Sequence, residues 1–200
     1  MAQRFKKLIL VGAALVAFSG AAEAHVGHGS TAGFAAGFAH PLSGLDHMLA
    51  MVAVGLFAAR LGGKALWQVP GAFVAMMALG GILGMNGFSL PYVELGIAAS
   101  VIVLGAAVAL EFSLPAAAAM GLAGFFALFH GHAHGSEMPL VASGFSYGAG
   151  FIAATILLHG LGLGLGVATL RATGSRSSDV VKVAGTAIAV AGFGLMAGWL

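Results

Sequence analysis

The chain has 200 residues, of which 60% are hydrophobic and 7% are charged, and its formal net charge is +2. Soluble domains carry about 25% charged residues, so this composition excludes a water-facing surface over most of the molecule and indicates an integral membrane protein. The eight Lys and Arg residues form no basic stripe, which argues against a nucleic-acid partner. Because cysteine is absent, thiolate metal sites, iron–sulfur clusters, disulfides and covalently attached haem are excluded.

The first 24 residues have the pattern of a cleavable signal peptide. Basic residues at positions 4, 6 and 7 precede the apolar stretch LILVGAALVAF, and residues 22–24 (AEA) fit the small-x-small cleavage rule. The alternative is an additional transmembrane helix, but the apolar stretch is too short to span comfortably. We therefore predict a signal peptide at 1–24 and one membrane domain at 25–200, with His25 as the new N-terminus.

Six apolar segments follow, each close to the roughly 20 residues that cross a bilayer. They run approximately over residues 41–59, 65–85, 92–110, 115–134, 143–170 and 183–200. Most prolines lie just before or at a predicted helix start, where a missing N–H costs little: Pro41, Pro91, Pro115 and Pro139. Pro70 is inside the second segment and predicts a kink. The sequence thus predicts an all-α bundle of six transmembrane helices.

The distribution of basic residues gives the orientation of these helices. If residue 25 is outside, the inside connections are 60–64, 111–114 and 171–182. Every basic residue after the signal segment falls there: Arg60, Lys64, Arg171, Arg176 and Lys182. This agrees with the positive-inside rule and predicts a bacterial inner-membrane protein whose mature termini are both periplasmic.

Glycine is abundant, with 33 residues, and forms three small-xxx-small patterns: Gly80-xxx-Gly84, Gly160-xxx-Gly164 and Gly162-xxx-Gly166. Small residues let helices approach closely inside a membrane, where lipid provides no hydrophobic drive for association. Any one of these patterns can arise by chance in a glycine-rich chain. Together they predict a tightly packed bundle.

The first segment opens with the polar sequence HPLSGLDH. Counting about 20 residues outward from its inner end places His40 at the outer edge of the membrane, and Asp46 and His47 about 8–10 Å deep. On a continuous helix, His40 and His47 share one face, with Ser43 between them. Ionisable residues inside membranes usually face a cavity or a partner. The alternative, that Asp46 is a structural hydrogen-bond partner of another helix, leaves both histidines unexplained.

The stretch FHGHAHGSE ends the fourth segment. Counted from the start of that segment, it forms the outer end of a membrane helix rather than a loop. His130 and His134 then lie one turn apart on one face, a spacing that suits two imidazoles on one metal ion. His132 points away, Gly135 is a natural terminator, and Glu137 can fold back. The alternative is an exposed histidine-rich turn without a site.

Both polar clusters lie at the same predicted depth. Together they offer six candidate metal ligands: His40, Asp46, His47, His130, His134 and Glu137. A nitrogen-rich set with a few carboxylates suits Ni²⁺, Co²⁺, Zn²⁺ or Cu²⁺, whereas Mg²⁺ and Ca²⁺ prefer oxygen. Ligand type does not choose among the first four ions.

Six other residues are accessory candidates: His25, His28, His132, His159, Glu94 and Glu111. The α-amine and imidazole of His25 could chelate a metal ion together with His28, although a solvated tail is equally compatible. His159 and Glu111 could be stepping stones inward from the outer clusters. Alternatively, Glu94 and Glu111 are interfacial residues and His159 is a packing residue.

At these residues the chain resembles the HupE/UreJ family of nickel and cobalt permeases. The family pattern H-x5-D-H is matched by His40, Asp46 and His47. The pattern F-H-G-x-A-H-G-x-E is matched by Phe129, His130, Gly131, Ala133, His134, Gly135 and Glu137, and His132 fills a variable position. The resemblance implies a secondary permease rather than an enzyme. It would carry Ni²⁺, or Co²⁺, as substrate without a permanently bound cofactor and feed hydrogenase or urease maturation.

Two other classes of function use the same residue types. An intramembrane metal-dependent hydrolase needs three ligands and an activated water, with Ser43 and Glu137 as possible helpers. A b-type haem protein could use His47 and His130, although the nearby Asp46 argues against haem. The chain has no nucleotide-binding motif, so a permease would be driven by an ion gradient, the membrane potential or sequestration of the metal inside the cell.

Overall fold

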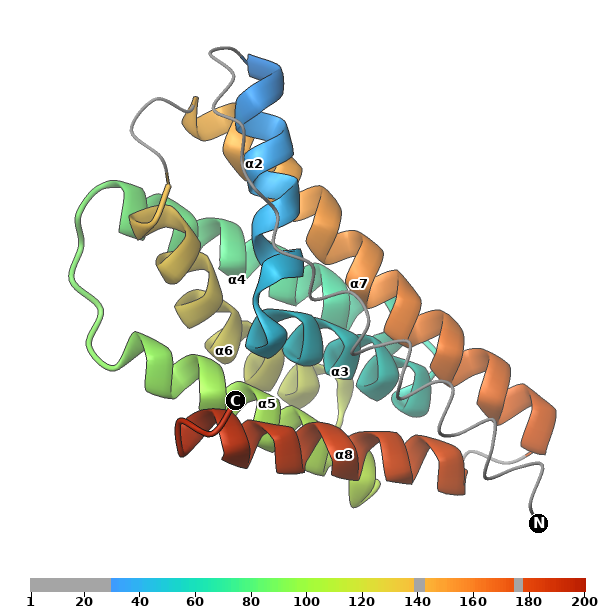
Figure 1. Cartoon of the computed structure of the whole chain (residues 1–200). Coiled ribbons are helices and arrows are strands. Elements are labelled where there is room, and N and C mark those ends of the chain that lie inside the picture. Colours follow the sequence, from blue (N-terminus) through green and yellow to red (C-terminus); the bar gives the residue numbers. More distant parts are fainter. Residues whose placement is uncertain (1–29, 139–142, 175–177) are drawn as a thin grey trace.

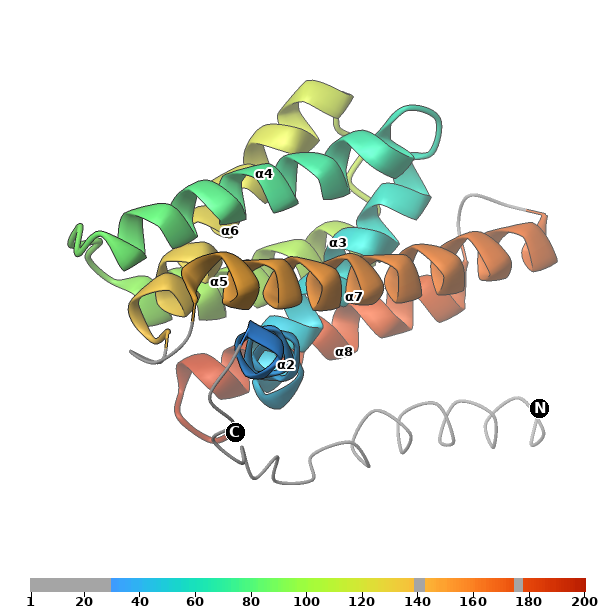
Figure 2. The same ribbon diagram turned by 90° about the horizontal axis from the view of Figure 1, so that it is seen from above.

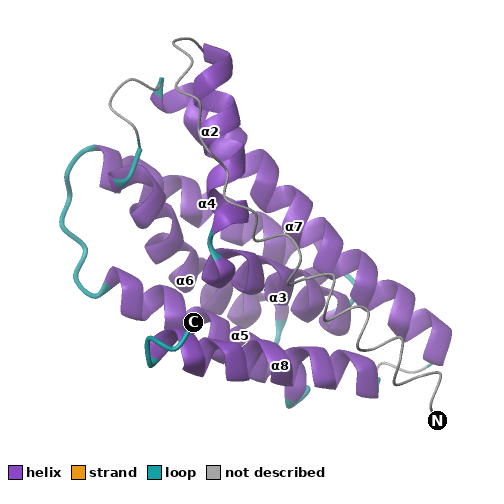
Figure 3. Cartoon of the chain, viewed as in Figure 1, coloured by secondary structure: helices purple, strands orange, loops and turns teal. Residues whose placement is uncertain are grey.

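The computed structural model describes residues 30–138, 143–174 and 178–200, and within this part of the chain every regular element is a helix (Figures 1 and 3). The helices are α2 (Ser30–Ser43), α3 (Leu45–Leu61), α4 (Ala65–Met85), α5 (Val93–Ala109), α6 (Ala116–Ser136), α7 (Gly144–Thr173) and α8 (Asp179–Met196). The predicted signal peptide, His25 and His28 lie outside the described residues.

Helix α3 runs through the middle of the bundle (Figure 2). Between Met48 and Ala59 its sequence is apolar on every side, and most residues of the helix are buried, with Met51 and Phe57 fully so. A helix without a polar face is stable only when it is surrounded. Three helix pairs surround it, namely α4 with α6, α5 with α8, and α2 with α7, and α7 also packs along α3 itself.

Several helices are suited to a membrane. Helices α4, α6, α7 and α8 are each long and apolar enough to cross one, and the bent pair formed by α2 and α3 passes the same criterion when taken together. Helix α5 is apolar but has only 17 residues. The predicted all-α membrane class is confirmed, whereas the count of six spans stays a prediction.

The prediction that the first membrane helix is continuous is wrong. Instead of one helix that begins at Pro41, the segment forms α2 and α3, which are bent by 83° relative to each other at Gly44. Pro41 lies inside α2 rather than at a helix start. The last predicted segment is also displaced, because α8 begins at Asp179 and ends at Met196.

Local hydrogen bonds explain the break at Gly44. At the end of α2, the Ser43 hydroxyl donates to the backbone carbonyl of His40 at 2.7 Å. At the start of α3, the Asp46 carboxylate accepts from the backbone N–H of His47 at 2.7 Å. Such side-chain bonds compete with helix continuation. A Cβ atom on Gly44 would lie only 2.7 Å from Oδ1 of Asp46, so the glycine gives the carboxylate room to fold back.

Glycines bring helix backbones together as the sequence predicted. A Cβ atom at either position of Gly80-xxx-Gly84 would collide with backbone atoms of α6, and one at either position of Gly162-xxx-Gly166 would collide with α3. The Gly160-xxx-Gly164 pattern has no such role, because a Cβ atom there meets nothing within 4 Å. Two of the three patterns therefore lie at close helix contacts.

Candidate metal site

Four histidine rings from three helices form a continuous row, here called the histidine cluster: His40 on α2, His47 on α3, and His130 and His134 on α6. The ring centroids of His40 and His134 are 4.7 Å apart, those of His134 and His47 are 4.3 Å apart, and those of His47 and His130 are 4.7 Å apart. The structure thus brings both predicted motifs together.

The cluster leads from a partly exposed end to a dry interior. The His40 side chain is 34% exposed, whereas His134 is 1% and His130 is 0% exposed. The row therefore connects the outside of the bundle with its core.

Glycines fix the position of α6 in this arrangement. A Cβ atom on Gly131 would collide with the backbone of Met77, and one on Gly135 with the backbone of Gly81. These contacts pin one face of α6 to α4. The adjacent face, which carries His130 and His134, then points toward α3.

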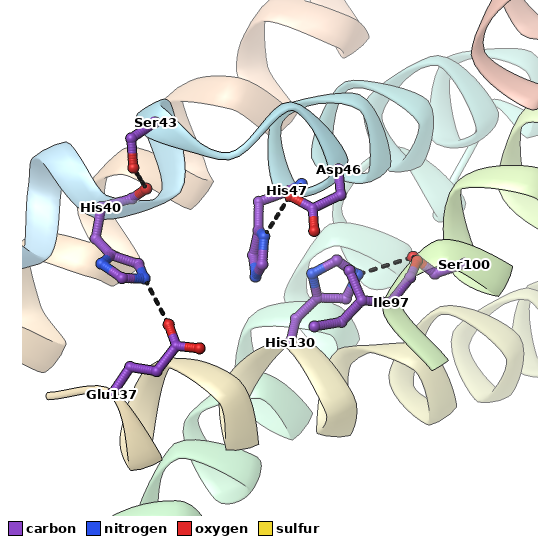
Figure 4. Close-up of polar contacts among 8 residues, drawn as sticks. All are labelled: His40, Ser43, Asp46, His47, Ile97, Ser100, His130 and Glu137. Atoms are coloured by element: carbon purple, nitrogen blue, oxygen red, sulfur yellow. Dashed lines mark hydrogen bonds and ion pairs between the residues drawn. The ribbon is translucent and has the colours of Figure 1, made fainter. Parts of the chain in front are cut away.

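Helix α6 extends to Ser136, so the histidine-rich stretch is helical, as predicted. Glu137 follows directly and folds back, with its Oε2 accepting a hydrogen bond from Nε2 of His40 at 3.1 Å (Figure 4). His132 does not join the cluster. It is buried, its Nε2 donates to the carbonyl oxygen of Phe88 at 2.6 Å, and its Nδ1 has no hydrogen-bond partner among the described residues.

The tautomer of His47 follows from its partner (Figure 4). Oδ1 of Asp46 lies 2.8 Å from Nδ1 of His47. An ionised carboxylate can only accept a hydrogen bond, so Nδ1 carries the proton and Nε2 carries a lone pair. Nε2 is buried and has no hydrogen-bond partner in the described part of the chain. A carboxylate behind a ligating histidine is the usual support of metal sites.

A serine fixes the opposite tautomer on His130 (Figure 4). The hydroxyl of Ser100 donates its single proton to the carbonyl oxygen of Ile97 at 2.6 Å. It must therefore accept from Nε2 of His130, which lies 2.8 Å away. This leaves the lone pair on Nδ1, which is buried and has no partner among the described residues. Ser100 was not predicted; its only signal in the sequence is a lone hydroxyl in an apolar helix.

His134 lies in the middle of the row, between His40 and His47, with its ring centroid 4.0 Å from that of Phe151. Neither of its ring nitrogens has a hydrogen-bond partner within the described ranges. An unsatisfied buried polar group costs about 1–3 kcal/mol, and such groups are rare enough to require an explanation. Lone pairs on buried imidazoles are suited to a divalent transition-metal ion.

The cluster is not a closed coordination site. Across residues 30–138, 143–174 and 178–200, no three His, Asp or Glu side chains are arranged so that they could hold one metal ion together. The rings instead meet edge to face. Coordination of one ion by several of them therefore requires rotation of the rings.

An acidic cleft leads to Asp46 from the side of α5 and α8. It has a volume of about 400 Å³ and is lined by Asp46, Glu94, Leu95, Ala98, Leu195, Met196 and Leu200. Two carboxylates on a low-dielectric wall raise the local concentration of cations. Glu94, predicted as an accessory residue, thus shares a cleft with a member of the first motif.

The remaining accessory candidates lie apart from the cluster. The Glu111 carboxylate is 3.7 Å from Nη1 of Arg60 and 3.6 Å from Nζ of Lys182. Arg60 also donates to the backbone carbonyl of Glu111. Glu111 is therefore part of an ion-pair group, and its role as a stepping stone stays a prediction. His159 is buried in α7, with its ring centroid 5.0 Å from that of Phe73.

Comparison with known proteins gives a consistent result. The family model described as HupE / UreJ protein matches residues 13–195. Protein HupE from Rhizobium leguminosarum bv. viciae is 50% identical over 195 residues, which cover 98% of this chain and 100% of that protein. No solved structure matches the chain significantly.

Proposed function

The chain belongs to the HupE/UreJ family, and from this premise we propose that it is a permease for a divalent transition-metal ion. Its first substrate is Ni²⁺ and its second is Co²⁺. It moves the ion inward across the bacterial inner membrane and thereby supplies hydrogenase or urease maturation. The metal ion is a substrate, and no resident cofactor is required.

The observation that carries this proposal is the set of open imidazole nitrogens in the histidine cluster. Asp46 and Ser100 each hold one histidine so that its lone pair, rather than its proton, is left without a partner among the described residues. An orphaned buried polar group is costly, and here the rings that carry the open nitrogens contact one another. His132 also has an open Nδ1, but its ring does not belong to this row. Ion binding supplies the missing interaction at His47 and His130.

The proposed topology has a cleaved segment at 1–24, a single domain at 25–200, six spans and periplasmic termini. Its support is the separation of charge along the bundle. Arg60 and Lys182 lie at the end that carries Glu111, and basic residues favour the cytoplasmic side. The histidine cluster and Glu94 lie toward the opposite ends of their helices, so the ion enters from the periplasm.

The membrane potential is a sufficient driving force for such uptake. A cation that moves inward gains about 2.3 kcal/mol per charge for each 100 mV, and a divalent ion gains twice that. A transport site must also release its ion. A row of histidines that engages the ion through ring rotation is better suited to release than a closed tetrahedral site.

The test is metal uptake by purified protein in vesicles. We expect Ni²⁺ to enter under an imposed inside-negative potential, with Co²⁺ as the best competitor and Zn²⁺ and Cu²⁺ as weaker ones. Vesicles without protein are the control. If neither Ni²⁺ nor Co²⁺ enters faster than in the control, the proposed function is wrong.

The geometry does not favour the two other classes of function. The rings of His47 and His130 meet edge to face with centroids 4.7 Å apart, which leaves no space for a porphyrin between them. The Ser43 hydroxyl donates to the backbone of its own helix, so it is committed to ending α2 rather than to hydrolysis. The absence of a Soret band in cofactor-replete protein would exclude haem independently.

A further inference from the structure

His159 is a buried histidine that the histidine cluster does not include. It lies midway along α7, is 3% exposed, and neither ring nitrogen has a hydrogen-bond partner within the described residues. A leucine of similar volume would avoid the cost of burying an unsatisfied polar group. The histidine therefore calls for an interaction that the packed protein does not supply.

One aromatic ring separates His159 from the cluster. The Phe73 ring centroid lies 5.7 Å from that of His130, the most deeply buried member of the cluster, and 5.0 Å from that of His159. Phe73 is itself fully buried. His130 on α6 and His159 on α7 are thus both neighbours of the same phenyl ring.

The surroundings of His159 offer a second kind of metal ligand. Thr155 lies one turn before His159 on α7, and Met77 lies one turn after Phe73 on α4. The Thr155 hydroxyl donates to Sδ of Met77 at 3.6 Å, and both residues are fully buried. Imidazole and thioether are ligands for late transition-metal ions, whereas Mg²⁺ and Ca²⁺ require oxygen.

The same face of α7 leads from His159 to the inner end of the bundle. His159, Leu163, Val167 and Leu170 are spaced by four, four and three residues and so lie along one face. Val167 and Leu170 line a surface cleft of about 360 Å³, together with Ala59, Gly62, Leu66, Arg171 and Gly174. Eight residues separate His159 from Val167, or about 12 Å along the helix.

We propose that His159 is an inner metal-binding station. It receives the ion from His130 past the ring of Phe73 and releases it toward the inner cleft. Met77 provides a thioether beside this path. The station rests on the proposed function, because it has a role only if an ion leaves the histidine cluster inward.

The first test is His159→Leu, with Leu158→Met as the matched control. Leu158 is buried in the same turn of α7. We expect His159→Leu to bind Ni²⁺ at the outer cluster with unchanged affinity and to melt at the same or a higher temperature. Its Ni²⁺ uptake should fall to the rate of protein-free vesicles, while the control retains uptake. Uptake by His159→Leu at the wild-type rate would overturn the station.

The second test exploits the absence of cysteine from the natural chain. His159→Cys and Leu158→Cys each introduce a single thiol, which is then treated with a small water-soluble cationic methanethiosulfonate. An ion path predicts rapid modification at position 159, slowed by Ni²⁺, and slow modification at position 158. A packing role predicts equally slow modification at both positions, which would overturn the station.

These two tests separate the station from the proposed function. If the wild-type protein takes up neither Ni²⁺ nor Co²⁺, the proposed permease function is wrong. The cysteine test then still measures metal binding at position 159: slower modification of His159→Cys in the presence of Ni²⁺ supports the station, and unchanged modification overturns it. Active wild-type protein with full uptake by His159→Leu would count against the station alone. If His159→Leu does not fold, His159→Gln replaces it, because its amide keeps the site polar but is a poor metal ligand.

Discussion

The two polar groups at opposite ends of the bundle differ in how far their polar atoms find partners within the protein. In the inner group, Glu111 pairs with Arg60 and with Lys182, so each charge meets its opposite. In the outer histidine cluster, His47 and His130 each have one ring nitrogen, and His134 has two, without a hydrogen-bond partner within the described residues. The inner group thus pairs its own charges, whereas the outer cluster retains ring nitrogens without a partner among the described residues.

This difference separates structure from function in a membrane protein. Ionisable groups are costly inside a bilayer and are retained where they pair with each other or take part in function. The inner group meets the first condition without a ligand. The outer cluster meets it only in part, because Asp46 and Ser100 satisfy one nitrogen each of His47 and His130, and the other nitrogen of each ring has no partner among the described residues. Substitutions should therefore affect transport at the outer end and stability at the inner end.

The largest effect is expected for His47→Ala. It removes the ring that contacts both His130 and His134, so the row is interrupted in the middle. We expect loss of Ni²⁺ uptake in proteoliposomes while helix content by circular dichroism is retained. His132→Gln is the control, because it alters a buried histidine of α6 that lies outside the cluster and should retain uptake. Normal uptake by His47→Ala would show that the cluster is not the transport site.

A smaller effect is expected for Ser100→Ala, which removes the hydroxyl that orients His130. Loss of such an outer partner typically weakens metal binding by about 10–100-fold. Titration calorimetry with Ni²⁺ measures the change.

If Nδ1 of His130 is the ligand, His130→Asn should bind Ni²⁺ more tightly than His130→Gln, because the shorter amide reaches the position of Nδ1. The reverse order would contradict the assigned tautomer.

Gly131→Ala tests how α6 presents the cluster. The new methyl group would collide with the backbone of Met77, and overpacking of this kind costs about 1–3 kcal/mol. We expect a lower melting temperature in detergent and weaker Ni²⁺ binding. Gly121→Ala is the matched control on the same helix, since its methyl group meets nothing within 4 Å. Equal melting temperatures for the two variants would refute the close contact.

The smallest effect is expected for Glu111→Gln in the inner group. The amide keeps the shape and the backbone bond from Arg60 but removes the negative charge. Partly exposed ion pairs contribute up to about 1 kcal/mol each, so the loss of both pairs should lower the free energy of unfolding by up to about 2 kcal/mol. Uptake per folded molecule should be unchanged. A selective loss of uptake would place Glu111 on the ion path and would erase the contrast between the two ends.

Much of the fold could be predicted from the sequence because bilayer thickness constrains it. Segment lengths and composition identified the apolar helices, and counting from Pro115 placed the histidine-rich stretch correctly at the end of α6. Small-xxx-small spacing picked out three glycine patterns, and two of them lie at close helix contacts. These features depend on local spacing and on a membrane of known width.

The features that could not be predicted depend on contacts between distant residues. Nothing near Ser100 in the sequence indicates that its hydroxyl meets a histidine 30 residues away. The break at Gly44 was missed because the length of residues 41–59 is that of one continuous membrane helix. Its geometry depends on the Asp46 carboxylate folding back onto His47.

The bend at Gly44 determines how many rings of the cluster lie against His134. On a straight helix, His40 and His47 would be about 10 Å apart along the axis, which is more than their centroid distances to His134, 4.7 and 4.3 Å, taken together. The 83° bend lets both lie against His134. Helix α2 is held in this orientation by α7, because a Cβ atom on Gly37 would collide with the backbone of Tyr147 and one on Gly150 with the backbone of Phe34. The contact between α2 and α7 therefore sets the angle at which His40 meets the rings of α3 and α6.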